Sequence, residues 1–330
     1  MRNIRSQLFK TFGGLLAVIL ALVCFIAIAS AQTYPTKPIR LVIPFPPGGG
    51  TDIVGRPIAT KLSERLGKQV VVDNRGGGGS IIGNEMVAKA APDGYTLLIN
   101  GNTFIISHAL QKLPYDVMKS FTPIAKVGIG PTVLVVHPAV PANSVKDLLA
   151  LAKQKPGKLI FASSGMGSGN HMAMELLKIM GEIDFKIVHY KGAGPAMVDL
   201  LGGHADAMFA TIVQPIPHIK SGKLRALGSG GVKRSAGLPD VPTIAEGGVP
   251  GFEANQWWGI WAPAGTPAPI VDRLNKELKA ILALDEIKEL FLSQGAEVDY
   301  LSPTEFVSFL EGEMAKWTRV VKEANVKLEK

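Results

Sequence analysis

The feature that most constrains this chain is a repeated unit in which a short apolar segment, a loop of small residues and a helix follow one another. Apolar segments of strand length lie at residues 39–44, 69–72, 95–99, 158–162 and 186–188. Strands that alternate with helices predict βαβ units and a parallel, doubly wound sheet. The chain is therefore expected to fold as an α/β protein.

Three loops after predicted strands, at residues 45–50, 74–79 and 163–169, indicate where a ligand binds. In doubly wound sheets, ligands bind beyond the carboxyl ends of the strands, which is where these loops fall. Each loop also opens a helix, whose first N–H groups lack intrahelical partners and carry partial positive charge. Thr51 or Asp52 is expected to cap the first of these helices. Several such helix ends around one crevice can hold an anion without any arginine.

The last third of the chain follows a different pattern. Residues 252–261 are predicted to be an extended aromatic segment, and the helices after it follow no new series of strands. Thr266 is expected to cap the first of these helices. Ser302, Pro303 and Glu305 form a capping box with proline at the first helical position, which predicts the start of a long terminal helix. We expect these helices to pack back on the first domain.

The first 31 residues are interpreted as a secretory signal peptide. A basic head, an uncharged apolar run at residues 15–28 and an A-x-A-like site ending at Ala31 support cleavage after Ala31. An uncleaved anchor is disfavoured because the run is shorter than the roughly 20 residues of a membrane span. A lipoprotein cysteine at Cys24 is disfavoured because Val23 before it is bulky. The mature chain is therefore expected in a bacterial periplasm.

Composition then excludes several classes of protein. Cleavage removes the chain's only cysteine, so no disulfide, thiolate metal site or catalytic thiol is expected. Cleavage also removes three of the 35 basic residues, which lowers the formal net charge from +8 to +5. The remaining basic residues are scattered without aromatic neighbours, so nucleic-acid binding is not expected. The remaining length fits about two domains.

The glycine-rich loops do not match nucleotide sites. The first loop lacks the lysine that a P-loop needs and carries Asp52, which would repel phosphate. In the second, Asn170 stands where the dinucleotide motif has its last glycine. No cofactor is therefore expected.

A periplasmic hydrolase using Ser164 or Ser168 with His171 is a rival interpretation, but no acidic residue is identified to orient the histidine. Ser168 is better explained as a helix N-cap that also faces the crevice. His171 and Glu175 lie one helical turn apart, and a packed or solvated pair is favoured over two metal ligands. No metal site is expected.

Three further features have alternative explanations. Met166 lies within a loop and could line a pocket, whereas the other methionines fit helical packing. Asp206 could receive a ligand amine or merely end a strand, and the sequence does not favour either. The tryptophans of the aromatic segment favour core or interdomain packing over a sugar-stacking platform; they are Trp257, Trp258 and Trp261.

From about residue 34 to its C-terminus the chain resembles the Bug family, the extracytoplasmic solute receptors of tripartite tricarboxylate transporters. The resemblance rests on the order and spacing of several segments: "YPTKPIRLVIPFPPGGGTD", "AAPDGYTLL", "PGKLIFASSGMGSGNHMAMELLK", "YKGAGPAMVDLLGG", "GKLRALG", "LPDVPTIAEGGVPGFE", "APAGTPAPIVDRLNKEL" and "LSPTEFVSFLEGEMAKW".

That resemblance implies a two-domain type II periplasmic-binding-protein (flytrap) fold with a hinge and a ligand cleft between doubly wound domains. Domain 1 would comprise residues 32–132 and 251–330, and domain 2 residues 133–250. It implies a non-enzymatic receptor that binds a small carboxylate as a monomer and delivers it to membrane permease subunits. A sensory adaptor for a two-component sensor kinase is the alternative within this interpretation.

The resemblance also implies that backbone amides and ordered waters pin a carboxylate between the loop after the first strand and its equivalent in domain 2. The expected ligand-binding residues are Phe45, Pro47, Gly48, Gly49, Thr51, Asp52, Asn102, Thr103, Ser163, Ser164, Met166, Gly167, Ser168, His171, Tyr190, Asp206 and Thr211. The chain departs from the family pattern at residues 76–79, His189 and Ala210. Two of these lie near the expected crevice, so the ligand of a relative cannot be transferred to this chain.

Overall fold

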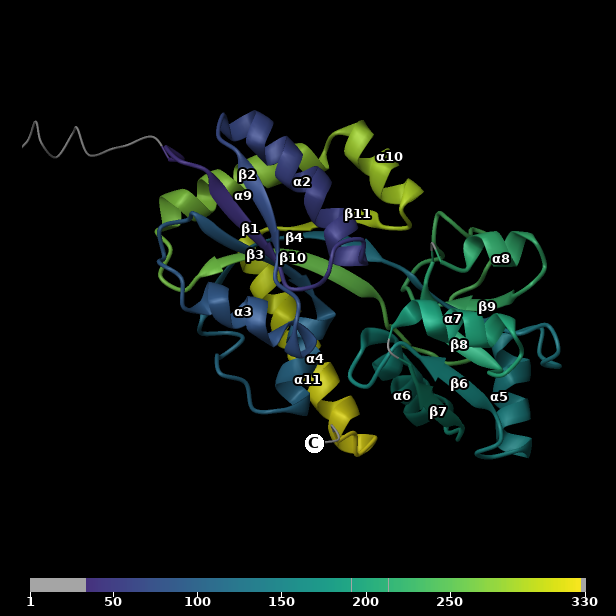
Figure 1. The fold of residues 1–330 in the computed structure, drawn as a ribbon. Coiled ribbons are helices and arrows are strands. Elements are labelled where there is room, and N and C mark those ends of the chain that lie inside the picture. Colours follow the sequence, from purple (N-terminus) through teal and green to yellow (C-terminus); the bar gives the residue numbers. More distant parts are fainter. Residues whose placement is uncertain (1–33, 191, 213, 328–330) are drawn as a thin grey trace, which may run out of the picture.

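A computed structural model describes residues 34–190, 192–212 and 214–327, and shows two β-sheets, each with its own helices (Figure 1). The six-stranded sheet has the order β11-β4-β10-β3-β1-β2, and the five-stranded sheet the order β7-β6-β8-β5-β9. We call the first sheet with helices α2–α4 and α9–α11 the first lobe, and the second sheet with α5–α8 the second lobe. The predicted signal peptide lies outside the described residues.

The first lobe takes its elements from both ends of the chain. They are β1 (Ile39–Ile43), α2 (Gly50–Leu66), β2 (Val70–Asn74), η1 (Gly78–Ser80), α3 (Ile81–Ala88), β3 (Thr96–Gly101), α4 (Asn102–Leu110), β4 (Phe121–Gly130), β10 (Gln256–Pro263), α9 (Ala268–Leu282), α10 (Asp285–Ser293), β11 (Glu297–Leu301) and α11 (Pro303–Glu323).

The second lobe is formed from the middle of the chain. Its elements are β5 (Thr132–Val136), α5 (Val145–Gln154), β6 (Ile160–Ser163), α6 (Gly169–Gly181), β7 (Lys186–His189), α7 (Ala193–Leu201), β8 (Ala207–Thr211), α8 (Ile216–Lys220) and β9 (Arg225–Ser229). The five strands expected from the apolar segments are present, with ends shifted by no more than two residues.

The sheets are mixed, and the expectation of a purely parallel sheet is wrong. In the first lobe β1 pairs in parallel with β2 and β3, but β10 runs antiparallel between β3 and β4. In the second lobe β5 is antiparallel to both β8 and β9. Because β4 leads into the second lobe and β10 returns from it, the two strands run in opposite directions side by side.

Two chain segments cross between the lobes and lie next to one another. One comprises residues 130–132, where β4 passes into β5, and the other comprises residues 254–256, which lead into β10. Gly230 N donates to Thr132 O at 2.8 Å, and Thr132 Oγ1 donates to Ala254 O at 2.6 Å. These crossing segments connect the two lobes, and we refer to them as the hinge.

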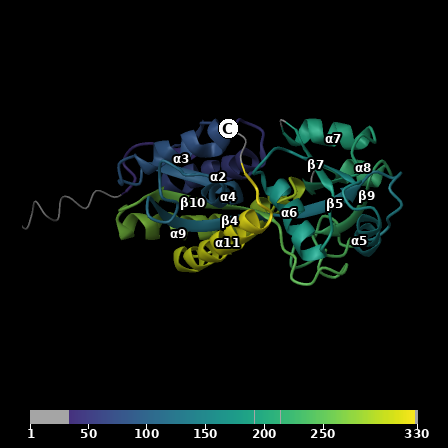
Figure 2. The same cartoon turned by 90° about the horizontal axis from the view of Figure 1, so that it is seen from below.

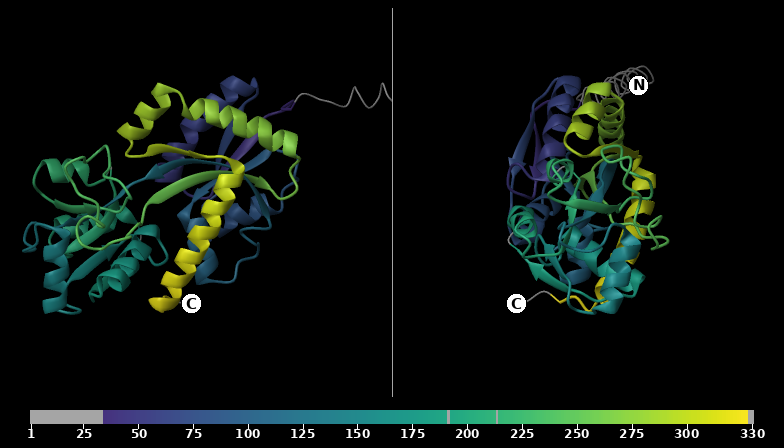
Figure 3. Two further views of the ribbon diagram at one scale, coloured as in Figure 1. Left: turned by 180° about the vertical axis from the view of Figure 1, so that it is seen from behind. Right: turned by 90° about the vertical axis from the view of Figure 1, so that its right-hand side faces the viewer.

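The terminal helix confirms one expected cap and lies against both lobes. Ser302 and Glu305 form the predicted capping box of α11. Figures 2 and 3 show α11, in yellow, running along the first lobe, and it contacts both α4 and α6. The expected cap at Thr266 is wrong, because its hydroxyl donates to Pro263 O and Pro267 precedes α9.

The expected aromatic packing is confirmed. Trp257, Trp258 and Trp261 are each at most 2% exposed. Trp257 Nε1 donates to Glu313 Oε2 at 2.8 Å, and Trp317 Nε1 donates to the same oxygen at 2.9 Å. The aromatic strand β10 is thereby joined to α11. Within the described part of the chain, none of the helices is long and apolar enough to cross a bilayer.

Candidate functional site

A cavity of about 190 Å³ lies between the lobes, and we call it the interlobe cavity. It is bordered by the N-terminal ends of three helices, by the ends of β6 and β8, and by one residue of each crossing segment. Its lining residues are Asn102, Thr103, Thr132, Ser164, Ser168, Gly169, Asn170, Ala193, Thr211, Gln214 and Gln256.

Three helices begin at this cavity. Asn102, Gly169 and Ala193 are the first residues of α4, α6 and α7, and all three line it. The unpaired N–H groups at such ends, together with the helix dipole, create positive potential. The arrangement can therefore hold an anion.

The lining residues that the structure describes carry no ionisable side chain. Their polar groups are the hydroxyls and amides of threonine, serine, asparagine and glutamine. An anion in this cavity would thus be held by neutral donors and helix ends, without a formal counter-charge among the described lining residues. Such neutral donors recognise a group by geometry as much as by charge.

The second-lobe loop, residues 163–168, is folded by its own hydrogen bonds. Ser163 Oγ donates to Gly165 O at 3.0 Å, and Ser168 Oγ donates to the same oxygen at 2.6 Å. Ser168 also caps α6, because its Oγ accepts from His171 N at 3.3 Å. Gly167 N donates to His171 Nδ1 at 3.0 Å. The loop is therefore shaped before any ligand arrives.

His171 supports this loop from the protein interior and does not line the interlobe cavity. The residue is 3% exposed, and its Nε2 lies 3.5 Å from Glu175 Oε1. The packed pair expected for His171 and Glu175 is present. Ser164 Oγ meanwhile donates to Asn170 Oδ1 at 2.5 Å. An activated serine nucleophile requires a hydrogen bond to the ring of its histidine. The hydroxyls of Ser164 and Ser168, the two candidate nucleophiles of the hydrolase interpretation, hydrogen bond to other groups instead.

The first-lobe loop, residues 45–52, does not line the interlobe cavity. Its residues 46–50 are exposed, and Phe45 packs partly into the first-lobe core. Thr51 Oγ1 accepts a hydrogen bond from Trp258 Nε1 at 3.3 Å. The expected cap at Thr51 or Asp52 is wrong, because Gly49 occupies that position and makes no side-chain bond.

Asp52 instead organises the first-lobe loop. Its Oδ2 accepts from Gly48 N at 2.9 Å and from Arg56 Nε at 2.7 Å, and its Oδ1 accepts from Asn74 Nδ2 at 2.9 Å. Asn74 Nδ2 also donates to Phe45 O at 3.0 Å. Burial alone would raise the pKa of Asp52, but hydrogen bonds from Arg56, Gly48 and Asn74 outweigh burial and lower it.

A buried polar network positions the start of α4. Asn100 Oδ1 accepts from Gly101 N at 2.7 Å, and Asn100 Nδ2 donates to Asn84 Oδ1 at 2.9 Å. Asn84 Nδ2 donates in turn to Ser80 Oγ and Tyr115 OH. Both asparagines are fully buried, so the network fixes the backbone that leads into the cavity.

Five of the expected ligand-binding residues line the interlobe cavity, and six lining residues were not anticipated. The five are Asn102, Thr103, Ser164, Ser168 and Thr211. Of the six, Gly169, Asn170 and Ala193 begin helices, and a more exact reading of the helix starts would have found them. Gln214 follows β8 by a short turn. Thr132 and Gln256 lie on the crossing segments, which no motif marks.

Asp206 and Tyr190 are not among the lining residues of the interlobe cavity. Asp206 precedes β8, about 16 Å of strand from Thr211 at its other end. Its Oδ2 accepts from Ile160 N at 2.7 Å, which agrees with the strand-end alternative. Tyr190 OH donates to the Asp199 carboxylate, which together with burial raises the pKa of Tyr190 to about 12.

The remaining expected residues keep positions in the two loops. Ser163 is fully buried beneath the second-lobe loop, and Met166 and Gly167 are half-buried in it. Their contact with a ligand stays a prediction, as does that of the first-lobe loop.

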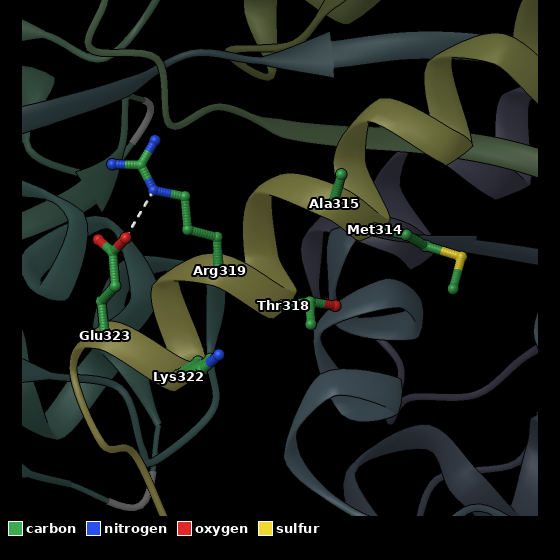
Figure 4. Close-up of a pocket in the computed structure, with 6 residues that line it drawn as sticks. All are labelled: Met314, Ala315, Thr318, Arg319, Lys322 and Glu323. Atoms are coloured by element: carbon green, nitrogen blue, oxygen red, sulfur yellow. Dashed lines mark hydrogen bonds and ion pairs between the residues drawn. The ribbon is translucent and has the colours of Figure 1, made fainter.

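A larger hollow, of about 640 Å³, lies on α11. Its six lining residues, shown in Figure 4, all come from that one helix, and Arg319 Nε donates to Glu323 Oε1 at 2.8 Å there. The hollow is a helix surface, whereas the interlobe cavity joins two lobes and three helix ends.

Two α/β lobes, two crossing segments and a polar cavity between the lobes define a periplasmic solute-binding protein. Solved structures of this class superimpose closely. The structure titled R. palustris Rpa4515 with adipate has a TM-score of 0.79 at 36% identity and covers 89% of this chain and 99% of that one. MatC from Rhodopseudomonas palustris with bound malate has a TM-score of 0.75 at 32% identity, covering 87% and 100%.

The chain belongs to the Bug family. Residues 54–326 match the family described as tripartite tricarboxylate transporter family receptor. Protein BugT of Bordetella pertussis is 39% identical over 320 residues, which are 95% of this chain and 98% of BugT. The resemblance and the fold class expected from the sequence are thereby confirmed, and the family is one of substrate-binding proteins.

Proposed function

We propose that this protein is a periplasmic receptor that captures a small organic carboxylate between its lobes and delivers it to a tripartite tricarboxylate-type membrane transporter. The observation that carries the proposal is the convergence of the α4, α6 and α7 N-termini on the interlobe cavity. A carboxylate accepts hydrogen bonds from N–H and hydroxyl groups and lowers its energy in the positive potential of helix ends. The receptor binds its ligand without chemical conversion.

In this proposal the ligand is held by both loops after closure. The second-lobe loop already borders the interlobe cavity, and the exposed first-lobe loop, with Pro47, Gly48 and Gly49, closes over the ligand from the other side. Closure excludes water and thereby strengthens each polar contact. The domain limits at residues 132 and 250, the monomeric state, export by residues 1–31 and contact with permease subunits belong to the same proposal.

Relatives with carboxylate ligands support the choice of ligand class. The Rpa4515 structure contains adipate and the MatC structure contains malate, as their titles state. In this chain the side-chain amides of Gln214 and Gln256 line the interlobe cavity. Neutral amides can bind a carboxylate, a hydroxyl or a carbonyl group.

The test is a ligand panel on the mature chain. Dicarboxylates, tricarboxylates, hydroxy acids, amino acids and aromatic acids are screened by thermal unfolding, and those that shift Tm are followed by calorimetry. At least one carboxylate is expected to raise Tm, because a ligand that binds only the folded state stabilises it by mass action. Neutral analogues, in which the carboxylate is replaced by a carboxamide, serve as the control and should not bind. If none of the carboxylates raises Tm, the proposal is contradicted.

A further inference from the structure

A second cavity, of about 280 Å³, lies on the other side of the crossing segments, and we call it the back cavity. Pro131 and Asn255 line it, whereas Thr132 and Gln256, the next residue of each segment, line the interlobe cavity. Successive side chains of an extended chain point to opposite faces. The two cavities therefore lie back to back across the hinge.

Glu297 bridges the back cavity from one lobe to the other. It belongs to β11 of the first lobe, where it pairs with Ile129 of β4. Its Oε1 accepts from Ser235 Oγ at 3.2 Å and from Ala236 N at 3.4 Å. Ser235 is 3% exposed, and the nearby Leu238 packs into the second-lobe core. The contact thus joins the two lobes away from the crossing segments themselves.

The first-lobe loop does not border the interlobe cavity in this structure. The first-lobe loop is exposed, and only second-lobe, α4 and crossing residues border the interlobe cavity. Rotation about the crossing segments that brings the two loops together must move the walls of the back cavity apart, because that cavity lies on the opposite side of the same hinge. Closure therefore lengthens the distance between Glu297 and Ser235.

Most residues that line the back cavity are polar or charged. The back cavity is lined by charged side chains from both lobes, and Asn255 Oδ1 is buried there without a partner among the described residues. The charged lining residues are Lys126, Lys233, Arg234, Glu253, Glu297 and Asp299. Widening such a crevice admits water to polar groups, which costs much less than parting an apolar interface. The hydrogen bonds of Glu297 then contribute a large part of the free-energy difference between the open and closed forms.

We propose that the contact of Glu297 with Ser235 and Ala236 is a latch that stabilises the open form and so sets ligand affinity from outside the ligand site. The inference rests on the proposed function, because it assumes closure around a ligand. A receptor whose binding-competent form is partly populated loses apparent affinity in proportion to that fraction. Removing the latch raises this fraction and tightens binding without touching the ligand.

The first experiment compares Glu297→Ala with the wild type. The dissociation constant for the best carboxylate of the panel, measured by calorimetry, should fall about three- to tenfold, the range expected for the net loss of an ordinary hydrogen bond. Glu297→Gln keeps an acceptor oxygen and should stay near wild type. Glu64→Ala removes the same charge from an exposed pair within α2 and should leave affinity unchanged. Unchanged or weaker binding by a folded Glu297→Ala variant would overturn the latch.

A second experiment locks the same crevice. The described residues contain no cysteine, so Ala236→Cys/Glu297→Cys can be joined selectively by a short, cleavable bismaleimide. The joined protein should bind at least tenfold more weakly, and cleavage of the linker should restore affinity. Full affinity while joined would refute the latch.

Small-angle scattering separates this inference from the proposed function. Without ligand, Glu297→Ala should have a smaller radius of gyration than the wild type, because more of it is closed. If the wild type binds no carboxylate, the proposed function is refuted. The comparison of the radius of gyration of ligand-free Glu297→Ala with that of the wild type still tests the latch. If the wild type binds a carboxylate but Glu297→Ala changes neither the dissociation constant nor the radius of gyration, the latch is refuted and the proposed function stands.

Discussion

At the scale of single residues, Asp52 organises the first-lobe loop through its hydrogen bonds. Its carboxylate oxygens accept hydrogen bonds from Gly48 in the loop and from Arg56 and Asn74 beside it. It is 4% exposed. Its role is to hold the glycine-rich loop in one shape.

The pKa of Asp52 predicts a specific pH dependence. Because the folded protein lowers that pKa, the stabilisation is fully present above the unfolded value of about 3.9 and is lost as pH falls through the folded value. Asp52→Asn should therefore reduce the free energy of unfolding by about 1–3 kcal/mol at pH 7, and the difference from wild type should shrink below about pH 4. Urea unfolding between pH 3 and pH 7 measures it.

Asp285→Asn is the control for this measurement. Asp285 pairs with Lys288 on the exposed surface of α10, so its replacement should change stability little at any pH. A loss in Asp52→Asn that stays constant from pH 7 to pH 3 would contradict the assigned role of the carboxylate.

At the scale of elements, the start of α6 combines stability and recognition in one residue. Ser168 caps the helix through its Oγ and also lines the interlobe cavity. Ser144 caps α5 in the same lobe, where its Oγ accepts from Asp147 N at 3.1 Å, and it does not border that cavity. The two serines form a matched pair that separates capping from ligand binding.

Ser168→Ala and Ser144→Ala should each lower the free energy of unfolding by about 1 kcal/mol, as loss of an N-cap does. Only Ser168→Ala should also weaken carboxylate binding, by several fold, because it removes a hydroxyl from the cavity wall and loosens the α6 terminus. Thermal unfolding and calorimetry on the two variants decide this. Equal affinities in both variants would remove Ser168 from the proposed site.

At the scale of the whole molecule, Trp258 is placed to report closure. Its Nε1 donates to Thr51 Oγ1, and its ring lies 3.2 Å from the position that a Cβ on Gly50 would take. The indole thus lies directly beneath the first-lobe loop. Trp317 is buried in α11 against Glu313, away from that loop.

Ligand binding is expected to change the intrinsic fluorescence through Trp258, because closure alters the polarity around the loop. Trp258→Phe should remove most of the change, whereas Trp317→Phe should retain it. A titration of each variant with the same carboxylate measures the effect. A signal that survives in Trp258→Phe and disappears in Trp317→Phe would place the conformational change elsewhere.

Local sequence by itself determined much of this protein. Apolar segments predicted the strands β1, β2, β3, β6 and β7, because strand formation depends on side chains close in sequence. The capping box at Ser302 and the N-cap at Ser168 are also local, and both are present. The family resemblance rests on the order and spacing of such segments along the whole chain.

Only the tertiary structure decided how distant residues meet. The antiparallel course of β10, the cavity-lining positions of Thr132 and Gln256 and the exclusion of Asp206 depend on where the chain crosses between lobes. No local pattern encodes these placements, because they arise from the packing of segments more than 100 residues apart. The sequence therefore predicted that helix N-termini would gather around one crevice, and the tertiary structure decided which helix N-termini border the interlobe cavity.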